Sequence, residues 1–156
     1  MRRLIAETIN SPAAGSDWSI TPSKSEWTKI VSLYTTLSTD ATVANRIVQF
    51  LIKDPSGNVA FRIATNITQT ASKSWSYSVT QALGNSYDNG ANPDGVAVIA
   101  IPCFYLPPLW SINSQTTGID SGDQWINMYL LAYQTDEQEE AHDFAVIEKA
   151  ITAQNG

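Results

Sequence analysis

Residues 45–64 of the chain read NRIVQFLIKDPSGNVAFRIA, and this stretch decides the fold class. It holds two runs rich in β-branched and aromatic residues, Arg46–Ile52 and Val59–Ile63, on either side of the turn formers Asp54–Asn58. Two such runs around a turn with Pro and Gly predict a β-hairpin. Because side chains alternate between the faces of a strand, at least one face should be buried. The alternation places Val48, Phe50 and Ile52 on one face and Ile47, Gln49 and Leu51 on the other.

Similar short runs of alternating apolar and polar residues recur along most of the chain. The most regular is Ser74–Thr80, in which Trp75, Tyr77 and Val79 alternate with serine and threonine. This pattern predicts that those three side chains are buried while Ser76 and Ser78 point away. The further predicted strands are Met1–Ile9, Trp18–Thr21, Thr28–Leu37, Val96–Ile101, Ser111–Thr117 and Gln124–Tyr133. Together they predict a mainly β protein, a single antiparallel β-sandwich over residues 1–134.

Three other segments complete the predicted organisation. In Thr28–Leu37, alternation groups Val31 with Leu33 and Leu37, and Ile30 with Tyr34 and the hydroxyls of Ser32 and Thr36. Gly84–Gly95 is rich in Asn, Asp and Gly and is expected to be a long loop. The last segment, residues 135–156, has acidic residues followed by apolar residues at helical spacing, which predicts a short C-terminal helix over Asp136–Ala153.

Length, charge and composition limit the possible functions. The 156 residues correspond to one domain with a core of its own. The net charge is −6 and the basic residues are scattered, which argues against a nucleic-acid surface. No run approaches membrane-spanning length, and no signal peptide is recognised. A single cysteine excludes an intrachain disulfide and fits folding in a reducing cytoplasm.

Catalytic and metal-binding residues are few. His142, the only histidine, lies among the acids of the predicted helix and is interpreted as a surface residue. Cys103 ends an apolar strand and is interpreted as a buried, unreactive thiol. The loop containing Asp88, Asn92 and Asp94 offers oxygen ligands but lacks the glycine and closing acid of a calcium loop. Asp120 and Asp123 fit an ordinary turn. We therefore expect no catalytic residues, no metal site and no cofactor, although two acids could still converge in space as in glycosidases.

Five tryptophans require an explanation, as core residues, sugar platforms or interface anchors. Trp75 and Trp125 lie in predicted strands and are expected in the core. Trp27 precedes a strand and Trp110 follows a Pro-rich extended segment, so these two are the interface candidates.

The segment Leu106–Leu130, LPPLWSINSQTTGIDSGDQWINMYL, continues through Tyr133 and resembles small tailed-bacteriophage virion proteins encoded among head and tail genes. In that pattern a Pro-rich turn, a Trp-x-Ile strand and a Gly-Asp-Gln-Trp strand opening close a jelly-roll-like sandwich, and the Met1–Thr21 opening adds weaker support. The resemblance implies a capsid decoration or cement protein, or a component near the head-to-tail junction, and offers no catalytic residues.

The first hypothesis is therefore a non-enzymatic virion protein that assembles in the bacterial cytoplasm and binds capsid, portal or connector subunits and its own copies. The second is a carbohydrate- or receptor-binding module of a tail or fibre, and the third is an enzyme. Met1–Ala14, Phe104–Trp110 and the helix from Asp136 are the segments expected to contact other chains. The interface candidates are Arg2, Arg3, Trp27, Phe104, Leu106, Trp110, Asp136 and Glu140.

Overall fold

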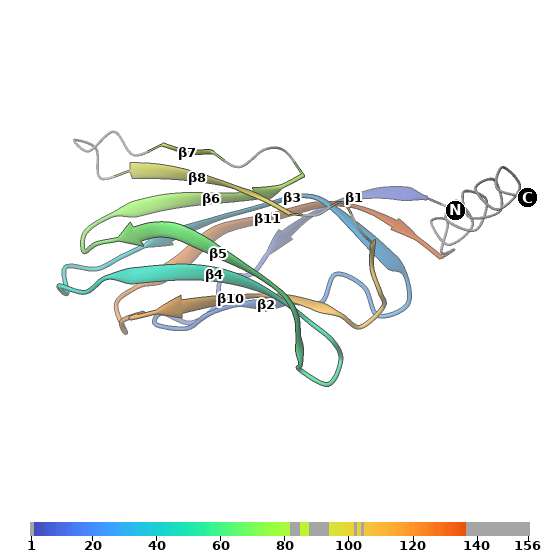
Figure 1. Cartoon of the computed structure of the whole chain (residues 1–156), viewed down its shortest axis with the longest axis horizontal. Helices are drawn as coiled ribbons and strands as arrows, with labels where there is room; N and C mark the ends of the chain where they lie inside the picture. The colour runs from blue at the N-terminus through green and yellow to red at the C-terminus, as the bar shows by residue number, and fades with distance from the viewer. Residues whose placement is uncertain (1, 82–84, 88–93, 102, 104, 137–156) are drawn as a thin grey trace, which may run out of the picture.

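The computed structural model describes residues 2–81, 85–87, 94–101, 103 and 105–136. Within these residues all regular structure is β-strand (Figure 1). The strands are β1 (Arg3–Ile9), β2 (Ser19–Ile20), β3 (Trp27–Ser38), β4 (Arg46–Lys53), β5 (Val59–Gln69), β6 (Ser74–Thr80), β7 (Asn85–Tyr87), β8 (Asp94–Ala100), β9 (Tyr105–Leu106), β10 (Ser111–Thr117) and β11 (Gln124–Thr135). Beyond Asp136, the predicted C-terminal helix lies outside the described residues.

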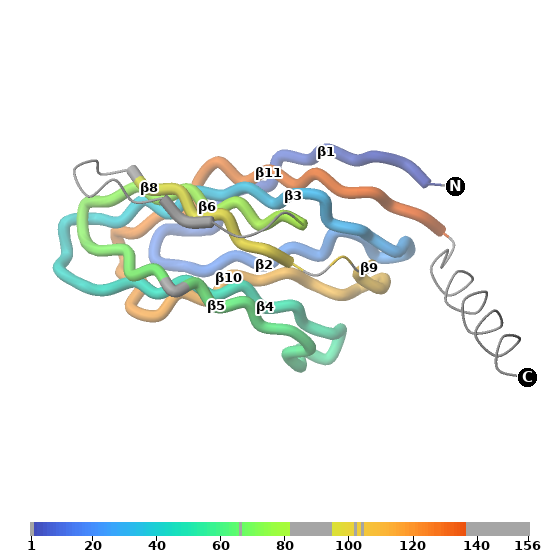
Figure 2. The backbone as a smooth tube through the Cα atoms, turned by 45° about the horizontal axis from the view of Figure 1, so that its top comes forward, coloured from blue at the N-terminus to red at the C-terminus, as the bar shows by residue number. Residues whose placement is uncertain are grey.

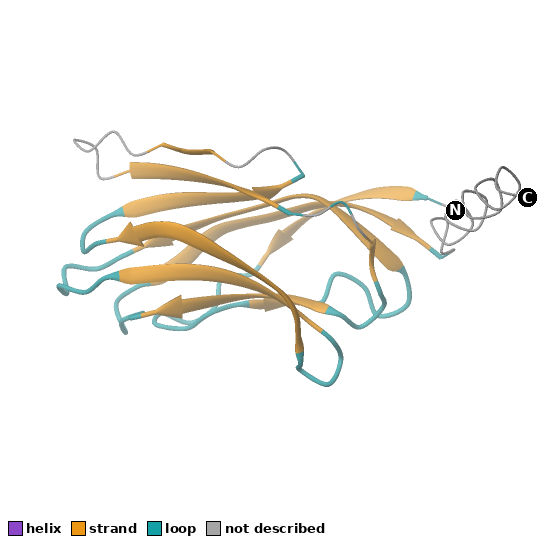
Figure 3. Cartoon of the chain, viewed as in Figure 1, coloured by secondary structure: helices purple, strands orange, loops and turns teal. Residues whose placement is uncertain are grey.

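The strands form two sheets that pack face to face, as the predicted β-sandwich requires (Figure 3). The larger sheet has the order β1-β11-β3-β6-β8-β7, with β9 also paired to β3, and the smaller sheet has the order β2-β10-β4-β5. The sandwich is not wholly antiparallel, because β6 and β8 pair in parallel. Asn85–Tyr87 also departs from the prediction of a loop, since it pairs with β8 as a short strand.

The β4–β5 hairpin has the predicted strands and turn. Asp54 closes the turn, since its Oδ1 accepts hydrogen bonds from the backbone N–H groups of Ser56 and Asn58, each at 2.9 Å. Hydrogen bonds from the side chain and backbone of Asn58 lower the pKa of the Asp54 carboxyl. On β4, Phe50 and its two same-face neighbours point into the core, so the buried face is the one that contains Val48, Phe50 and Ile52.

Strand β6 confirms the alternation predicted from its sequence. Trp75, Tyr77 and Val79 are buried, whereas Ser76 and Ser78 are half-exposed on the opposite face. The parallel neighbour of Trp75 is Gly95. A Cβ atom built on Gly95 would lie 2.3 Å from the Trp75 ring, so the indole occupies the volume that any other residue at position 95 would need.

Two irregularities in the β3–β11 ladder alter which side chains face inward. Between the pairs Ser32–Leu131 and Ile30–Ala132, Val31 is an extra residue on β3. Leu33 and Ile30 therefore both face inward, although an uninterrupted strand would place them on opposite faces. The predicted grouping of Val31 with Leu33 was wrong, because the bulge shifts the alternation of side chains by one residue. The second bulge lies on β11, where Asn127 adopts a φ of 52°.

An aromatic cluster joins the two sheets at the centre of the core. The ring centroids of Trp125 and Tyr77, both on the larger sheet, lie 5.7 Å apart. Tyr77 also approaches the ring of Phe50, which belongs to the smaller sheet. Trp18 contacts Phe50 at 5.8 Å and Trp125 at 6.1 Å. The Tyr77 hydroxyl donates to Gln69 Oε1 at 2.9 Å, and burial raises the pKa of Tyr77. The predicted burial of Trp75 and Trp125 is thus confirmed.

Candidate binding surface on the larger sheet

A buried ion pair closes one end of the sandwich. Arg46 opens β4 and Asp123 precedes β11, and both side chains are completely buried. Arg46 Nε donates to Asp123 Oδ2 at 2.8 Å and Arg46 Nη2 donates to Asp123 Oδ1 at 2.9 Å, a bidentate arrangement. These hydrogen bonds to Asp123 are the main reason that the pKa of Arg46 is raised.

The remaining donors of Arg46 are also used. Nη2 donates to Asp40 Oδ1 at 3.0 Å, and Nη1 donates to the carbonyls of Thr42 and Ala44, each at 2.9 Å. All five N–H groups of the guanidinium are therefore bonded within the protein. Asp123 additionally accepts the backbone N–H groups of Asp40 and Asp120. Asp123 was predicted only as part of an ordinary turn. In the structure its hydrogen bonds also hold the 40–46 and 118–123 loops together.

Exposed apolar side chains lie on both sheets, and those of the larger sheet include a group on its outer face. The cross-strand pairs Tyr129–Tyr34 and Tyr34–Ser78 place one row of side chains across β11, β3 and β6. The half-buried Val98 continues the row on β8. Ser76 and Val96, which pair with each other, lie in the next row on the same face. We name Tyr34, Ser76, Val96 and Tyr129 the outer patch. Its apolar members are well exposed, at 37% for Tyr34, 45% for Val96 and 50% for Tyr129.

Within the outer patch, the two tyrosines form one unit. Their ring centroids lie 6.4 Å apart with planes inclined by 36°. The Tyr34 hydroxyl lies 2.9 Å from Ser76 Oγ, which in turn lies 3.3 Å from Thr36 Oγ1. These hydrogen bonds orient the Tyr34 ring, and the hydroxyl groups of β3 and β6 border the rings. The four residues of the outer patch therefore combine exposed aromatic carbon with hydrogen-bonding groups, and none of the four carries a charge.

A second exposed row lies further along β11, toward its C-terminal end. Leu4 of β1 pairs with Tyr133 and is 57% exposed. The guanidinium carbon of Arg2 lies 4.2 Å from the centroid of the Tyr133 ring, which is cation–π geometry. Arg2, one of the predicted interface residues, thus lies beside this row.

The other predicted interface residues lie in separate parts of the structure. Arg3 Nη2 forms an exposed ion pair with Glu26 at 2.8 Å, while Trp27 begins β3 and is half-buried. Trp110 is also half-buried and packs against the core. Asp136 is exposed next to the end of β11.

Leu106 and Cys103 differ from their predictions. The Leu106 side chain is 2% exposed within the core, because β9 pairs with β3 and directs Leu106 inward. It therefore does not offer an apolar anchor to a partner. Cys103 is exposed rather than buried, since β8 ends at Ala100, before this residue. Phe104, Glu140, His142, Asp88 and Asn92 lie outside the described residues.

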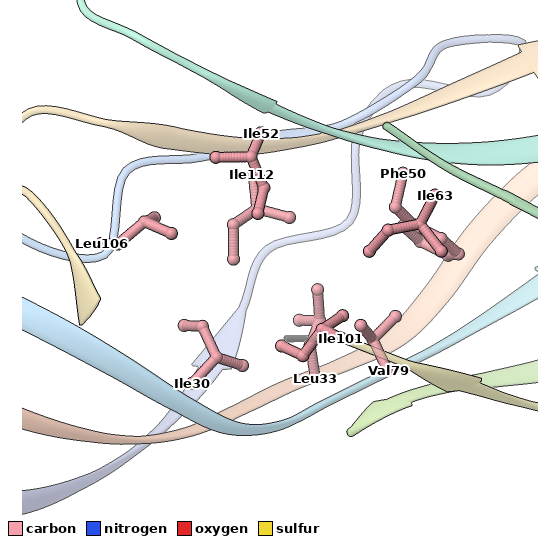
Figure 4. A pocket seen from close by; sticks show the side chains of 9 residues that line it. All are labelled: Ile30, Leu33, Phe50, Ile52, Ile63, Val79, Ile101, Leu106 and Ile112. Atoms are coloured by element: carbon pink, nitrogen blue, oxygen red, sulfur yellow. The ribbon is translucent and has the colours of Figure 1, made fainter. Parts of the chain in front are cut away.

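One cavity between the sheets is too small for a small molecule. An apolar cavity of about 10 Å³ lies between the sheets, with Ile30 and Leu33 on one side and Ile52 and Ile112 on the other (Figure 4). This volume is at the lower limit for one water molecule, and the lining gives a water no polar partners. A more open hollow of about 290 Å³ lies between β5 and β8, lined by Ile63, Ala64, Thr65, Ile67, Val98, Ile99 and Ala100.

The described residues also contain no group of three or more His, Cys, Asp or Glu placed to hold a metal ion. In the same part of the chain, no helix has the length and hydropathy needed to cross a membrane. Comparisons of the chain with protein-family models, curated proteins and solved structures found no match.

Proposed function

We propose that the chain is a non-enzymatic structural component of a bacteriophage particle that binds capsid or connector subunits through the outer face of its larger sheet. The observation that carries the binding role is the exposed Tyr34–Tyr129 pair at the centre of that face. The assignment to a phage particle rests on the resemblance of Leu106–Tyr133 to small virion proteins. A decoration or cement protein and a head-to-tail junction protein both fit this proposal.

The chemistry of the outer patch favours another protein as the ligand. Tyrosine is enriched at interfaces because its ring buries apolar area while its hydroxyl keeps a hydrogen bond. Tyr34 already has such a bond, to Ser76. Because the row that crosses the patch contains no charged side chain, a partner can cover it without burying an unpaired charge. The arrangement therefore suits a closely packed contact between subunits.

The proposal predicts that the double variant Tyr34→Ser/Tyr129→Ser loses affinity for the particle. Removal of two anchor rings should weaken binding about tenfold or more, as expected for residues that dominate an interface. Quantitative mass spectrometry of gradient-purified particles would measure the copies bound. Ile47→Ser is the matched control, since Ile47 is equally exposed, at 37%, but belongs to the smaller sheet. Full occupancy by the double variant, or absence of the wild-type chain from particles, would contradict the proposal.

The alternative function is carbohydrate or receptor binding. The observation in its favour is again the outer patch, because a tyrosine ring bordered by the hydroxyls of Thr36, Ser76 and Ser78 can stack on a sugar and bond its hydroxyl groups. The 36° angle between the Tyr34 and Tyr129 rings gives a bent surface. A glycan array distinguishes the two functions: specific glycan binding that Tyr34→Ser abolishes would support the alternative.

A further inference from the structure

Strand β1 lies at the edge of the larger sheet. Its seven residues pair with β11 without a register shift, from Arg3–Gln134 to Ile9–Met128. No strand within the described residues pairs with its other side, and Figure 2 shows it as the outermost strand beside β11. An edge strand presents a row of unpaired main-chain N–H and C=O groups, which another extended strand can bind.

β1 lacks most of the devices that usually prevent such pairing. It has no proline, no lysine and no bulge, and it is of ordinary strand length. It does contain two charged residues, Arg3 and Glu7, of opposite sign. Their partners on β11, Gln134 and Leu130, are buried, so both belong to the face of the sheet that is directed toward the smaller sheet.

The sequence of β1 complements itself in one antiparallel register. With Ile5 opposite Ile5 of a second copy, Arg3 lies opposite Glu7 of that copy and Leu4 lies opposite Ala6 of that copy. The two-fold axis repeats each pair, which gives two cross-strand ion pairs and two apolar pairs. We propose that β1 pairs with β1 of a second copy of the chain around a two-fold axis at Ile5.

The charged residues select this register among the alternatives. A shift of two residues places Arg3 opposite Ile9 and Glu7 opposite Ile5 of the second copy, so both charges lose their complement. A shift of one residue moves every side chain to the wrong face. Only the register centred on Ile5 pairs both charges.

The existing contacts of these side chains are compatible with the second copy. Arg3 is 62% exposed at its side chain, and its bonds to Glu26 and Gln134 both use Nη2. Glu7 is exposed and forms no ion pair within the described part of the chain. On the outer face, Ala6 of the second copy would cover part of the Leu4 side chain, which is 57% exposed in the single chain. The pairing would also join the two larger sheets, with their outer patches on one continuous face.

Charge exchange tests the register directly. Arg3→Glu and Glu7→Arg each place like charges opposite one another twice per dimer, whereas the double variant Arg3→Glu/Glu7→Arg restores both pairs with reversed sign. We expect wild type and the double variant to dimerise in analytical ultracentrifugation at low salt. Each single variant should have a dimerisation affinity at least about tenfold lower than that of wild type. Arg62→Glu is the matched control, because exposed Arg62 undergoes the same charge change on the smaller sheet. Thermal unfolding verifies that each variant is folded.

Cysteine crosslinking gives a second readout in a Cys103→Ser background. Cysteine at position 5 would face its own copy across the axis and form a disulfide-linked dimer, while cysteine at position 8 would not. A wild-type chain that stays monomeric up to about 1 mM would overturn the proposal, since this is the weak limit of measurable association. The same conclusion would follow from dimers that are insensitive to both single charge variants, or from crosslinking at position 8 but not at position 5.

Discussion

At the scale of single residues, the Arg46–Asp123 pair is the least replaceable interaction described. Both groups are fully buried, and each is bonded on every side by protein atoms. A buried pair of this kind contributes little over an apolar replacement, but removal of one partner leaves an uncompensated charge in the interior. Its value to the fold therefore lies in holding the 40–46 and 118–123 loops in one arrangement.

We accordingly predict that Asp123→Asn lowers the free energy of unfolding by about 3 to 5 kcal/mol. The neutral amide retains the shape of the carboxylate but leaves the buried Arg46 charge with only Asp40 as a counterion, and the Asp40 side chain is partly exposed. Asp120→Asn in the same turn is the control and should cost less than about 1 kcal/mol, since Asp120 is partly exposed. Urea unfolding followed by tryptophan fluorescence measures both, and a cost below about 1 kcal/mol for Asp123→Asn would contradict this role.

Some features of single residues can be predicted from the sequence, whereas others depend on contacts between distant parts of the chain. The burial of Trp75 follows from strict alternation, a property of its own strand. The Arg46–Asp123 bond joins residues 77 positions apart, and no local pattern signals it. The inward position of Ile30 was equally inaccessible, because the bulge at Val31 depends on the pairing with β11. Tyr34 was correctly grouped with the hydroxyls of Ser32 and Thr36, yet its exposure depends on what covers the sheet.

At the scale of elements, the parallel pairing of β6 and β8 depends on a close contact. Gly95 faces the Trp75 ring at a distance that excludes a methyl group. We predict that Gly95→Ala destabilises the protein by about 1 to 3 kcal/mol through overpacking. Trp75→Ala should cost about 3 to 5 kcal/mol, because it opens a cavity in the core.

The double variant distinguishes this explanation from a simple effect of glycine on the backbone. With the indole removed, alanine at position 95 has room, so Gly95→Ala should cost much less in the Trp75→Ala background. Calorimetry of the four proteins in this cycle measures the coupling. Strictly additive changes would show that the two residues do not compete for the same space.

The elements themselves were largely predictable, and their pairing was not. Runs of β-branched and aromatic residues located β3, β4, β5, β6, β10 and β11, because strand propensity and alternation are local. The turn at Asp54–Asn58 followed from its Asp, Pro and Gly. By contrast, β8 lies parallel to β6 after a connection through β7, and the Asn-rich sequence around Asn85–Tyr87 gave no strand signal. Pairing with β8 overrides that weak local preference.

At the scale of the whole molecule, the two faces of the larger sheet have different roles. The inner face packs the aromatic cluster against the smaller sheet, and the outer face leaves Tyr34, Val96 and Tyr129 exposed. Alternation predicts this division in each strand, but only the strand order brings Tyr34 beside Tyr129. The interface candidates chosen from the termini and the Pro-rich segment did not include either tyrosine. If β1 pairs across a two-fold axis, both outer patches face the same side.

We propose above that the outer face of the larger sheet contacts other subunits of a phage particle. A photo-reactive benzoylphenylalanine introduced at position 129 tests it most directly, with position 47 on the smaller sheet as the control. After irradiation of purified particles, mass spectrometry should identify crosslinks from position 129 to a capsid, portal or connector protein and few from position 47. Crosslinks from position 47 alone, or from neither position in particles that contain the chain, would contradict the claim.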